Sequence, residues 1–190
     1  MDPLDKASDA ELVRRIQRGA VNGSEGQAAT GVLYDRYHER IFRYLWLRVG
    51  DRHQAEDLTG EVFTRMVASL PGYQNMDLPF TAWLYRIAHN LLVDQYRKQS
   101  LLQWVKLDDA DRFVMEKHDP SRDIDEHLAF EEVRRALEKI DPQQREVIIL
   151  RFLVGLPIKD VASILGKNIP NIKALQFRGL QRLRMILETA

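Results

Sequence analysis

Cysteine is absent from the 190-residue chain. A disulfide framework, a cysteine-ligated zinc site and thiol catalysis are therefore excluded. No apolar run approaches the roughly 18 residues that a membrane-spanning helix needs, so we expect no membrane insertion. The opening stretch MDPLDKASDAELVRR is polar and acidic and has no apolar segment of the kind found in secretory signals. These absences predict a cytoplasmic protein.

The short motifs that mark common enzyme classes are also missing. The sequence has no G-x-x-x-x-G-K-[ST] phosphate loop, no H-E-x-x-H zinc helix and no G-x-S-x-G nucleophile turn, and its five histidines are scattered. We therefore expect a protein that is not an enzyme, with no catalytic residue, no metal and no cofactor. An enzymatic interpretation would require a catalytic activity that persists when Arg178 and Asp57 are replaced.

Neither an alternating strand pattern nor an internal repeat is present, and apolar residues recur instead at helical spacings of three or four. The clearest apolar series are Leu58, Val62 and Met66, then Phe80, Leu84, Ile87 and Leu91, then Phe130, Val133, Leu137 and Ile140. Pro71 and Gly72 predict the end of the first of these helices. The predicted fold class is all-α.

Residues 99–125 interrupt this helical pattern with an acidic cluster and a Pro-Ser pair. We therefore predict two small helical domains, 1–98 and 126–190, joined by a flexible linker. An apolar patch at 104–107 lies within the linker. This patch either fastens the linker to a domain or docks a partner.

The C-terminal end is basic, although the whole chain carries 28 basic and 28 acidic residues. Between Lys159 and Arg184 there are six basic residues and one acidic residue. This segment has the spacing of a helix-turn-helix, which we predict for the C-terminal domain. Ala162 is small where the two helices cross, Gly166 tolerates a positive φ at the turn, and Ile172 anchors the second helix.

The second helix of this motif is amphipathic. Its apolar side holds Ile172, Leu175, Gly179, Leu183 and Ile186, and its other side holds Lys173, Ala174, Phe177, Arg178, Gln181 and Arg184. Such a helix suits a DNA major groove, where cations bind guanine or phosphate and apolar groups meet thymine methyls. The alternatives are a solvated helix of a small bundle and, for Phe177, a contact with a partner protein.

Two N-terminal segments also carry candidate binding residues. Asp57 and Glu61 lie one helical turn apart, where like charges cost a few tenths of a kcal/mol, so they form either a solvated face or an acidic strip for a basic partner. The stretch FTAWLYRIAHNLLVDQYRK interleaves Trp83, Tyr85 and Tyr96 with cations, as single-stranded DNA binding requires. Trp83 is equally suited to the core.

Together these segments resemble a bacterial RNA polymerase sigma factor of the sigma-70 family, extracytoplasmic-function (ECF) type, from about Ser8 to Leu187. YDRYHERIFRYL and AEDLTGEVF are similar to the family's core-polymerase-binding helices, and FTAWLYRIAHNLLVDQYRK is similar to its minus-10 recognition segment. LEKIDPQQREVIILRFLVGLPIKDVASILG and NIKALQFRGLQRLR are similar to its C-terminal, minus-35-reading domain.

The resemblance implies a sigma factor that binds core RNA polymerase, directs it to promoters and assists DNA melting. Its implied partners are core polymerase, double-stranded minus-35 DNA, single-stranded minus-10 DNA and an anti-sigma factor. The implied sites are Asp57, Glu61 and Phe63 for core polymerase; Asn75, Met76, Asp77, Trp83, Arg86, Asn90, Arg97 and Lys98 for minus-10 DNA; and Asn171, Lys173, Ala174, Phe177 and Arg178 for minus-35 DNA.

The sequence departs from the family pattern in several places. Gly60 stands where glutamine is usual, the segment 19–33 is longer than typical, Phe177 replaces a polar residue or histidine, and Gly179 replaces an alanine. An alternative function is a helix-turn-helix repressor or activator that does not replace the sigma subunit. That alternative explains residues 160–184 but neither the acidic strip nor the aromatic-cationic helix, and a stable homodimer on palindromic DNA would favour it.

Overall fold

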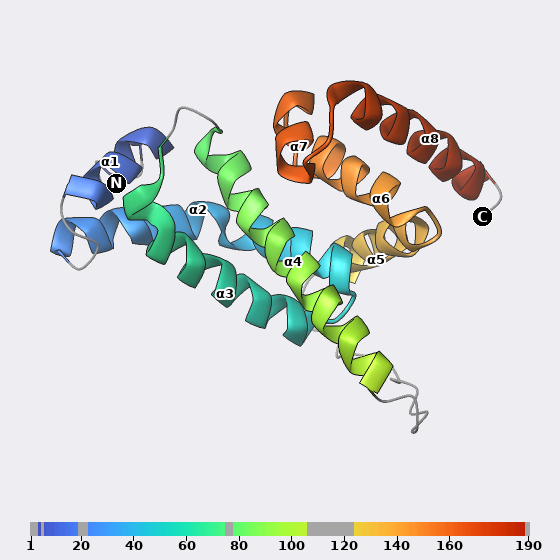
Figure 1. The fold of residues 1–190 in the computed structure, drawn as a ribbon, viewed down its shortest axis with the longest axis horizontal. Helices are drawn as coiled ribbons and strands as arrows, with labels where there is room; N and C mark the ends of the chain where they lie inside the picture. Colours follow the sequence, from blue (N-terminus) through green and yellow to red (C-terminus); the bar gives the residue numbers. More distant parts are fainter. Residues whose placement is uncertain (1–3, 5, 19–22, 75–77, 106–123, 189–190) are drawn as a thin grey trace. The chain divides into compact units, whose positions relative to one another are not determined.

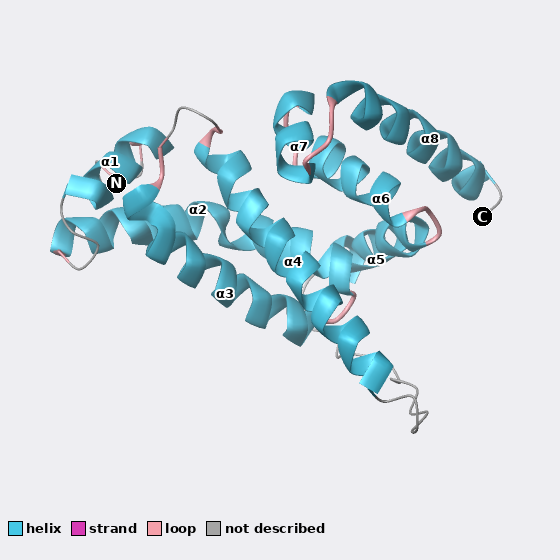
Figure 2. Cartoon of the chain, viewed as in Figure 1, coloured by secondary structure: helices cyan, strands magenta, loops and turns pink. Residues whose placement is uncertain are grey.

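The computed structural model describes residues 4, 6–18, 23–74, 78–105 and 124–188. All regular structure within these ranges is helical, which confirms the all-α prediction (Figure 2). The chain divides into two compact units, Met1–Lys98 and Gln99–Ala190. No helix in the described ranges is both long and apolar enough to cross a membrane.

The first unit contains four α-helices and a short 3-10 turn (Figure 1). These elements are α1 (Asp9–Arg18), α2 (Ser24–Val49), α3 (Arg52–Ser69), the turn η1 (Leu70–Gly72) and α4 (Phe80–Val105). Helix α4 therefore includes residues 99–105 of the segment expected to be a linker. The boundaries of that linker stay a prediction, because residues 106–123 lie outside the described ranges.

The predicted apolar series form the core of this unit. Buried positions include Leu58, Val62, Met66, Phe80, Leu84 and Leu91, while Ile87 is half-buried. Helix α3 begins after Asp51, whose carboxylate accepts a hydrogen bond from the backbone N–H of Gln54 at 2.6 Å. It ends at Ser69, and Pro71 lies in the turn that follows, as the sequence predicts.

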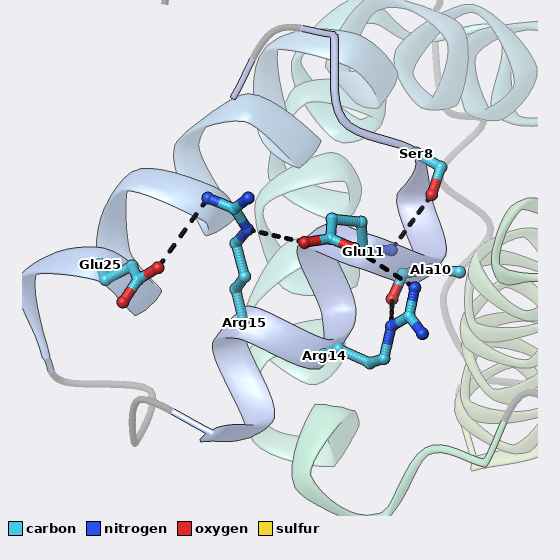
Figure 3. A network of polar contacts seen from close by, with 6 residues as sticks. All are labelled: Ser8, Ala10, Glu11, Arg14, Arg15 and Glu25. Carbon is cyan, nitrogen blue, oxygen red and sulfur yellow. Dashed lines mark hydrogen bonds and ion pairs between the residues drawn. The ribbon is translucent and has the colours of Figure 1, made fainter. Parts of the chain in front are cut away.

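Helix α1 is capped at its start by Ser8, whose hydroxyl accepts a hydrogen bond from the backbone N–H of Glu11 at 3.2 Å (Figure 3). The Glu11 carboxylate pairs with Arg14 at 3.3 Å and with Arg15 at 3.2 Å, and Arg15 also approaches Glu25 of α2 at 3.8 Å. Exposed pairs of this kind contribute little to stability individually, so they orient α1 more than they hold it.

The second unit contains α5 (Ile124–Glu138), α6 (Pro142–Ile148), the π-helical turn η2 (Ile149–Leu153), α7 (Ile158–Leu165) and α8 (Ile169–Glu188). In α5, Leu137 and the following Ile140 are buried, as predicted, but Val133 is 42% exposed, so that part of the predicted apolar series is wrong. Arg134 occupies the inward position instead. Its guanidinium can be buried because Glu131, at 3.0 Å, and Glu138 neutralise it.

The turn between α7 and α8 has the predicted geometry. Gly166 has a φ of 61°, the left-handed conformation that glycine adopts without strain. The N–H of Lys167 donates to the carbonyl of Ala162 at 2.9 Å, and that of Gly166 donates to Ser163 at 3.4 Å, which together make a Schellman motif. Ile172 is fully buried, so the helix-turn-helix prediction is confirmed.

Gly179 allows close packing between α8 and α6. A Cβ atom at this position would lie 2.6 Å from the Cδ1 of Ile148 and 3.1 Å from the Cβ of Gln144. Ile148 is buried and cannot withdraw freely. The short separation of these two helices therefore explains why a glycine stands at position 179, where the family usually has alanine.

We expect Gly179→Ala to lower the free energy of unfolding by about 1 kcal/mol, because overpacking outweighs the roughly 1 kcal/mol that alanine adds within a helix. Gly60→Ala is the matched control, since an added Cβ there meets nothing within 4 Å. It should raise the free energy of unfolding by about 0.5–1 kcal/mol. Urea unfolding of both variants measures the difference, and equal stabilisation by both would contradict close packing at Gly179.

Candidate nucleic-acid interface

The outer face of α8 is the first candidate surface. Lys173, Ala174, Phe177, Arg178, Gln181 and Arg184 are all exposed, while Ile172, Leu175 and Gly179 are buried and Leu183 and Ile186 are half-buried. The predicted division of the helix into two sides is confirmed. Phe177 is 63% exposed, an unusual exposure for a phenylalanine on a face that otherwise offers cations.

One polar contact caps α8 and another links it to η2. The side chain of Asn168 caps the helix by accepting a hydrogen bond from the backbone N–H of Asn171 at 2.9 Å. Arg151 of η2 donates to the side-chain oxygen of Gln176 at 3.4 Å and to the carbonyl of Leu156. Neither contact was predicted, although an asparagine directly before a helix is a recognisable capping signal.

The candidate residues of α4 form a second surface. On an ideal helix Trp83, Arg86, Asn90 and Arg97 lie within about 60° of one another, and Lys98 lies about 60° to one side. Arg86, Asn90, Arg97 and Lys98 are exposed. We call Trp83, Arg86, Asn90 and Arg97 the α4 strip.

Trp83 is half-buried at one end of this strip. Its ring centroid lies 4.5 Å from that of Tyr73 and 5.7 Å from that of Phe80. The indole therefore packs on the unit and is also partly exposed at its surface.

Tyr85 does not belong to this surface, contrary to the sequence-based interpretation. It is 1% exposed, and its ring meets that of Tyr44 edge-on at 5.3 Å. Burial raises the pKa of the Tyr85 hydroxyl to about 12, so it remains protonated, and it donates to the carbonyl of Arg40 at 3.4 Å. A buried ring cannot stack on a nucleic-acid base.

The remaining minus-10 candidates, Asn75, Met76 and Asp77, lie outside the described residues. The residues on either side of them are described. The Tyr73 hydroxyl donates to the carbonyl of Leu78 at 2.9 Å across this segment.

Helix α3 presents the acidic candidates. Asp57 and Glu61 are exposed, and Glu61 pairs with Arg65 at 2.8 Å. Arg65 also approaches Asp94 of α4 at 3.6 Å. Asp57 has no ion pair within the described part of the chain, so of the two acidic candidates on α3 its charge is the more available to a partner.

Phe63, the third polymerase-contact candidate, is 6% exposed. Its ring lies 4.7 Å from that of Tyr34, which is 41% exposed on α2. Phe63 therefore supports an exposed aromatic residue next to the acidic strip and presents little surface of its own.

These features define a two-unit helical protein whose C-terminal unit contains a helix-turn-helix. The family model "Sigma-70 region 2" matches residues 33–101, and "Sigma-70, region 4" matches residues 130–183. The chain is 34% identical to the ECF RNA polymerase sigma factor BldN of Streptomyces coelicolor, over 96% of this chain and 67% of that protein. It is also 34% identical to the ECF RNA polymerase sigma factor SigX of Bacillus subtilis, over 83% of this chain and 82% of that protein.

The chain belongs to the ECF RNA polymerase sigma factors of the sigma-70 family. It directs RNA polymerase to promoters, and this function is favoured over that of a repressor or activator that leaves the sigma subunit in place. Sigma factors are known as non-enzymatic initiation factors.

Solved structures share the fold. CnrH, in a complex with the cytosolic domain of CnrY, matches with a TM-score of 0.71 and 23% identity, over 95% of this chain and 97% of that one. RpoE of Bartonella quintana, in a complex with the anti-sigma factor NepR, matches with a TM-score of 0.69 and 23% identity, over 82% of this chain and 94% of that one.

Proposed function

We propose that the three candidate surfaces divide promoter recognition between them. The outer face of α8 reads the minus-35 element as duplex, the α4 strip and Lys98 bind the melted minus-10 strand beside Asn75, Met76 and Asp77, and Asp57 and Glu61 bind core polymerase. The observation that carries this proposal is the α4 strip. It brings a half-buried indole and exposed polar and cationic side chains onto one side of a helix.

Such a strip favours single-stranded over double-stranded DNA. Arg86 and Arg97 neutralise phosphates, and the indole of Trp83 offers an aromatic face or edge to a base that has left the duplex stack. The stacking energy is then available only to the opened strand, so it stabilises the melted state. The chain carries no net formal charge, so we expect it to bind DNA weakly until polymerase joins the complex.

Three further properties belong to the same proposal. The protein acts in the cytoplasm, where core polymerase works. Residues 1–98 and 126–190 are its two functional domains, with 99–125 as the linker. An anti-sigma factor controls it by covering polymerase-binding surfaces; support comes from the similar solved structures, in which CnrH is in a complex with the cytosolic domain of CnrY and RpoE with the anti-sigma factor NepR.

Arg86→Ala tests the role of the strip in melting. We expect transcription from a duplex promoter to fall roughly 10-fold or more, because a phosphate contact of the opened strand is lost. A template with a pre-melted minus-10 bubble should lose much less, since the opening is supplied. Arg14→Ala, which removes an exposed arginine from α1, is the control and should leave both templates unchanged. Equal losses on both templates would contradict a role in melting.

A further inference from the structure

The guanidinium of Arg65 on α3 is shared between carboxylates of two helices. Its Nε donates to Glu61, one turn earlier on α3, at 2.8 Å. Its Nη1 lies 3.6 Å from Oδ2 of Asp94 on α4, which is an ion pair but too long for a hydrogen bond. The side chains of Arg65, Glu61 and Asp94 are 41%, 48% and 49% exposed, so all three reach the surface. Two carboxylates therefore share one cation, and Glu61 holds it more closely.

Asp94 lies within the surface proposed to bind the opened strand. On an ideal helix it is about 20° from Trp83 and about 40° from Lys98, so it stands between the α4 strip and that lysine. Asn90 lies one turn before it on the same side. A carboxylate at this place repels the phosphates that the neighbouring cations attract. The surface therefore binds a strand most strongly when the charge of Asp94 is neutralised.

Glu61 belongs to the surface proposed to bind core polymerase, so Arg65 stands between the two surfaces. A basic group of polymerase that pairs with Glu61 competes with Arg65 for the same carboxylate. The guanidinium is then free to close the gap of 3.6 Å and to form a charge-assisted hydrogen bond with Asp94. Two carboxylates and one guanidinium carry a net charge of −1, and the cation from polymerase brings the group to neutrality.

We propose that Arg65 couples polymerase binding at Glu61 to strand binding on α4, by neutralising Asp94 once polymerase has engaged Glu61. This inference rests on the proposed roles of those two surfaces. Arg65 acts through Asp94 and is a positioning residue, without a DNA contact of its own. By linkage, a bound strand strengthens polymerase binding by the same factor. Exposed ion pairs are weak, so we expect a factor of about two to five.

The experiment measures how the free full-length chain binds a labelled single-stranded oligonucleotide of mixed sequence. Fluorescence anisotropy is recorded at low salt, where phosphate contacts are strongest. Glu61→Gln takes the place of polymerase, because it removes the charge that holds Arg65 away from Asp94. We expect this variant to bind the strand about three-fold more tightly than the parent. In an Arg65→Met background the same substitution should produce no such gain, because no guanidinium is left to transfer.

Glu56→Gln is the matched control on the same helix. Glu56 pairs with Arg52 of α3 at 3.0 Å, and its side chain is 47% exposed, against 48% for Glu61. The control removes the same charge but releases no cation toward Asp94, so strand affinity should stay close to that of the parent. If Glu56→Gln raises the affinity as much as Glu61→Gln does, the gain comes from net charge alone and the coupling is wrong.

Asp94→Asn distinguishes an effect through Asp94 from a direct contact between Arg65 and the strand. Arg65→Met should lower the strand affinity of the parent by about two-fold, because Asp94 is left uncompensated. The same substitution should cost nothing in the Asp94→Asn background. An equal loss in both backgrounds would mean that Arg65 binds the strand itself, and it would overturn the role given to Asp94. Melting temperatures confirm that each variant is folded.

Arg86→Ala tests the α4 strip separately from the coupling. If Arg86→Ala lowers strand affinity while the effects of Glu61→Gln, Arg65→Met and Asp94→Asn are simply additive, the coupling is wrong and the proposed role of the strip stands. If Arg86→Ala and the three charge variants all leave strand affinity unchanged, the proposed role of the strip fails and the coupling fails with it.

Discussion

Replacing Asp57 and Glu61 together with lysine is expected to abolish co-purification with core RNA polymerase while the protein remains folded. Reversal of both charges brings like charges together, which should cost several kcal/mol of binding if the contacts are buried in the complex. The fold should tolerate the change because both side chains are exposed. Among the described residues the change removes the exposed Glu61–Arg65 pair, and such pairs contribute about 0–1 kcal/mol.

The control for this prediction must change the total charge equally. Lysine at both Glu25 and Glu188 does so at exposed positions in α2 and α8, and it should leave polymerase binding close to that of the parent. The measurement is co-purification with core enzyme, with the melting temperature recorded for each variant. A folded Asp57→Lys, Glu61→Lys double variant that binds core polymerase as the parent does would overturn the role given to α3.

The second large effect is expected at Phe177. Lys173 and Arg178 are five residues apart, about 140° around an ideal helix, so they flank the strip that contains Ala174 and Phe177. We propose that the exposed Phe177 ring meets a thymine methyl or sugar in the minus-35 element, with Arg178 on phosphate or guanine. Phe177→Ala should cost roughly 1–3 kcal/mol at the cognate promoter and relax the preference at one position.

Lys173→Ala is the companion variant, because a phosphate contact carries no base information. It should weaken all sequences alike and reduce the salt dependence of binding by about one unit of slope. Selection of minus-35 sequences by both variants separates the two roles. If Phe177→Ala selects the parent's motif with the parent's strength, Phe177 does not read DNA and a contact with a partner protein explains its exposure better.

The helix-turn-helix could be predicted from the sequence because its determinants are local. The positions of Ala162, Gly166 and Ile172 fix a close crossing, a left-handed turn and an anchor within one short stretch. The two sides of α8 follow from the same helical period, and burial confirms each assignment. The helical period and the turn residues were sufficient to predict burial where one face of a helix packs on a single neighbouring surface.

The errors came from contacts between distant segments. Val133 and Tyr85 were misplaced because helical period alone does not show which neighbour an inward position meets. Arg134 turns inward since two glutamates accompany it, and Tyr85 is buried against α2. The helical period also cannot show that Gly179 packs closely against α6.

Gln17 carried no signal in the sequence at all. Its side-chain nitrogen donates to the carbonyls of Leu70 and Tyr73, which lie 53 and 56 residues further along the chain. A glutamine near the end of a short polar helix has no local feature that distinguishes it from a solvated residue. These contacts could therefore be found only once the fold brought α1 and η1 together.

Promoter-dependent transcription in vitro tests the central claim most directly. The reaction contains core RNA polymerase, a library of genomic fragments and either the parent chain or no added factor. Transcripts should begin at a defined set of sites that share minus-35 and minus-10 elements, and only when the chain and core enzyme are both present. The contrary result would be no initiation when the chain and core enzyme are combined without another sigma factor, together with stable binding of a homodimer to palindromic DNA and an effect on transcription only when another sigma factor is supplied.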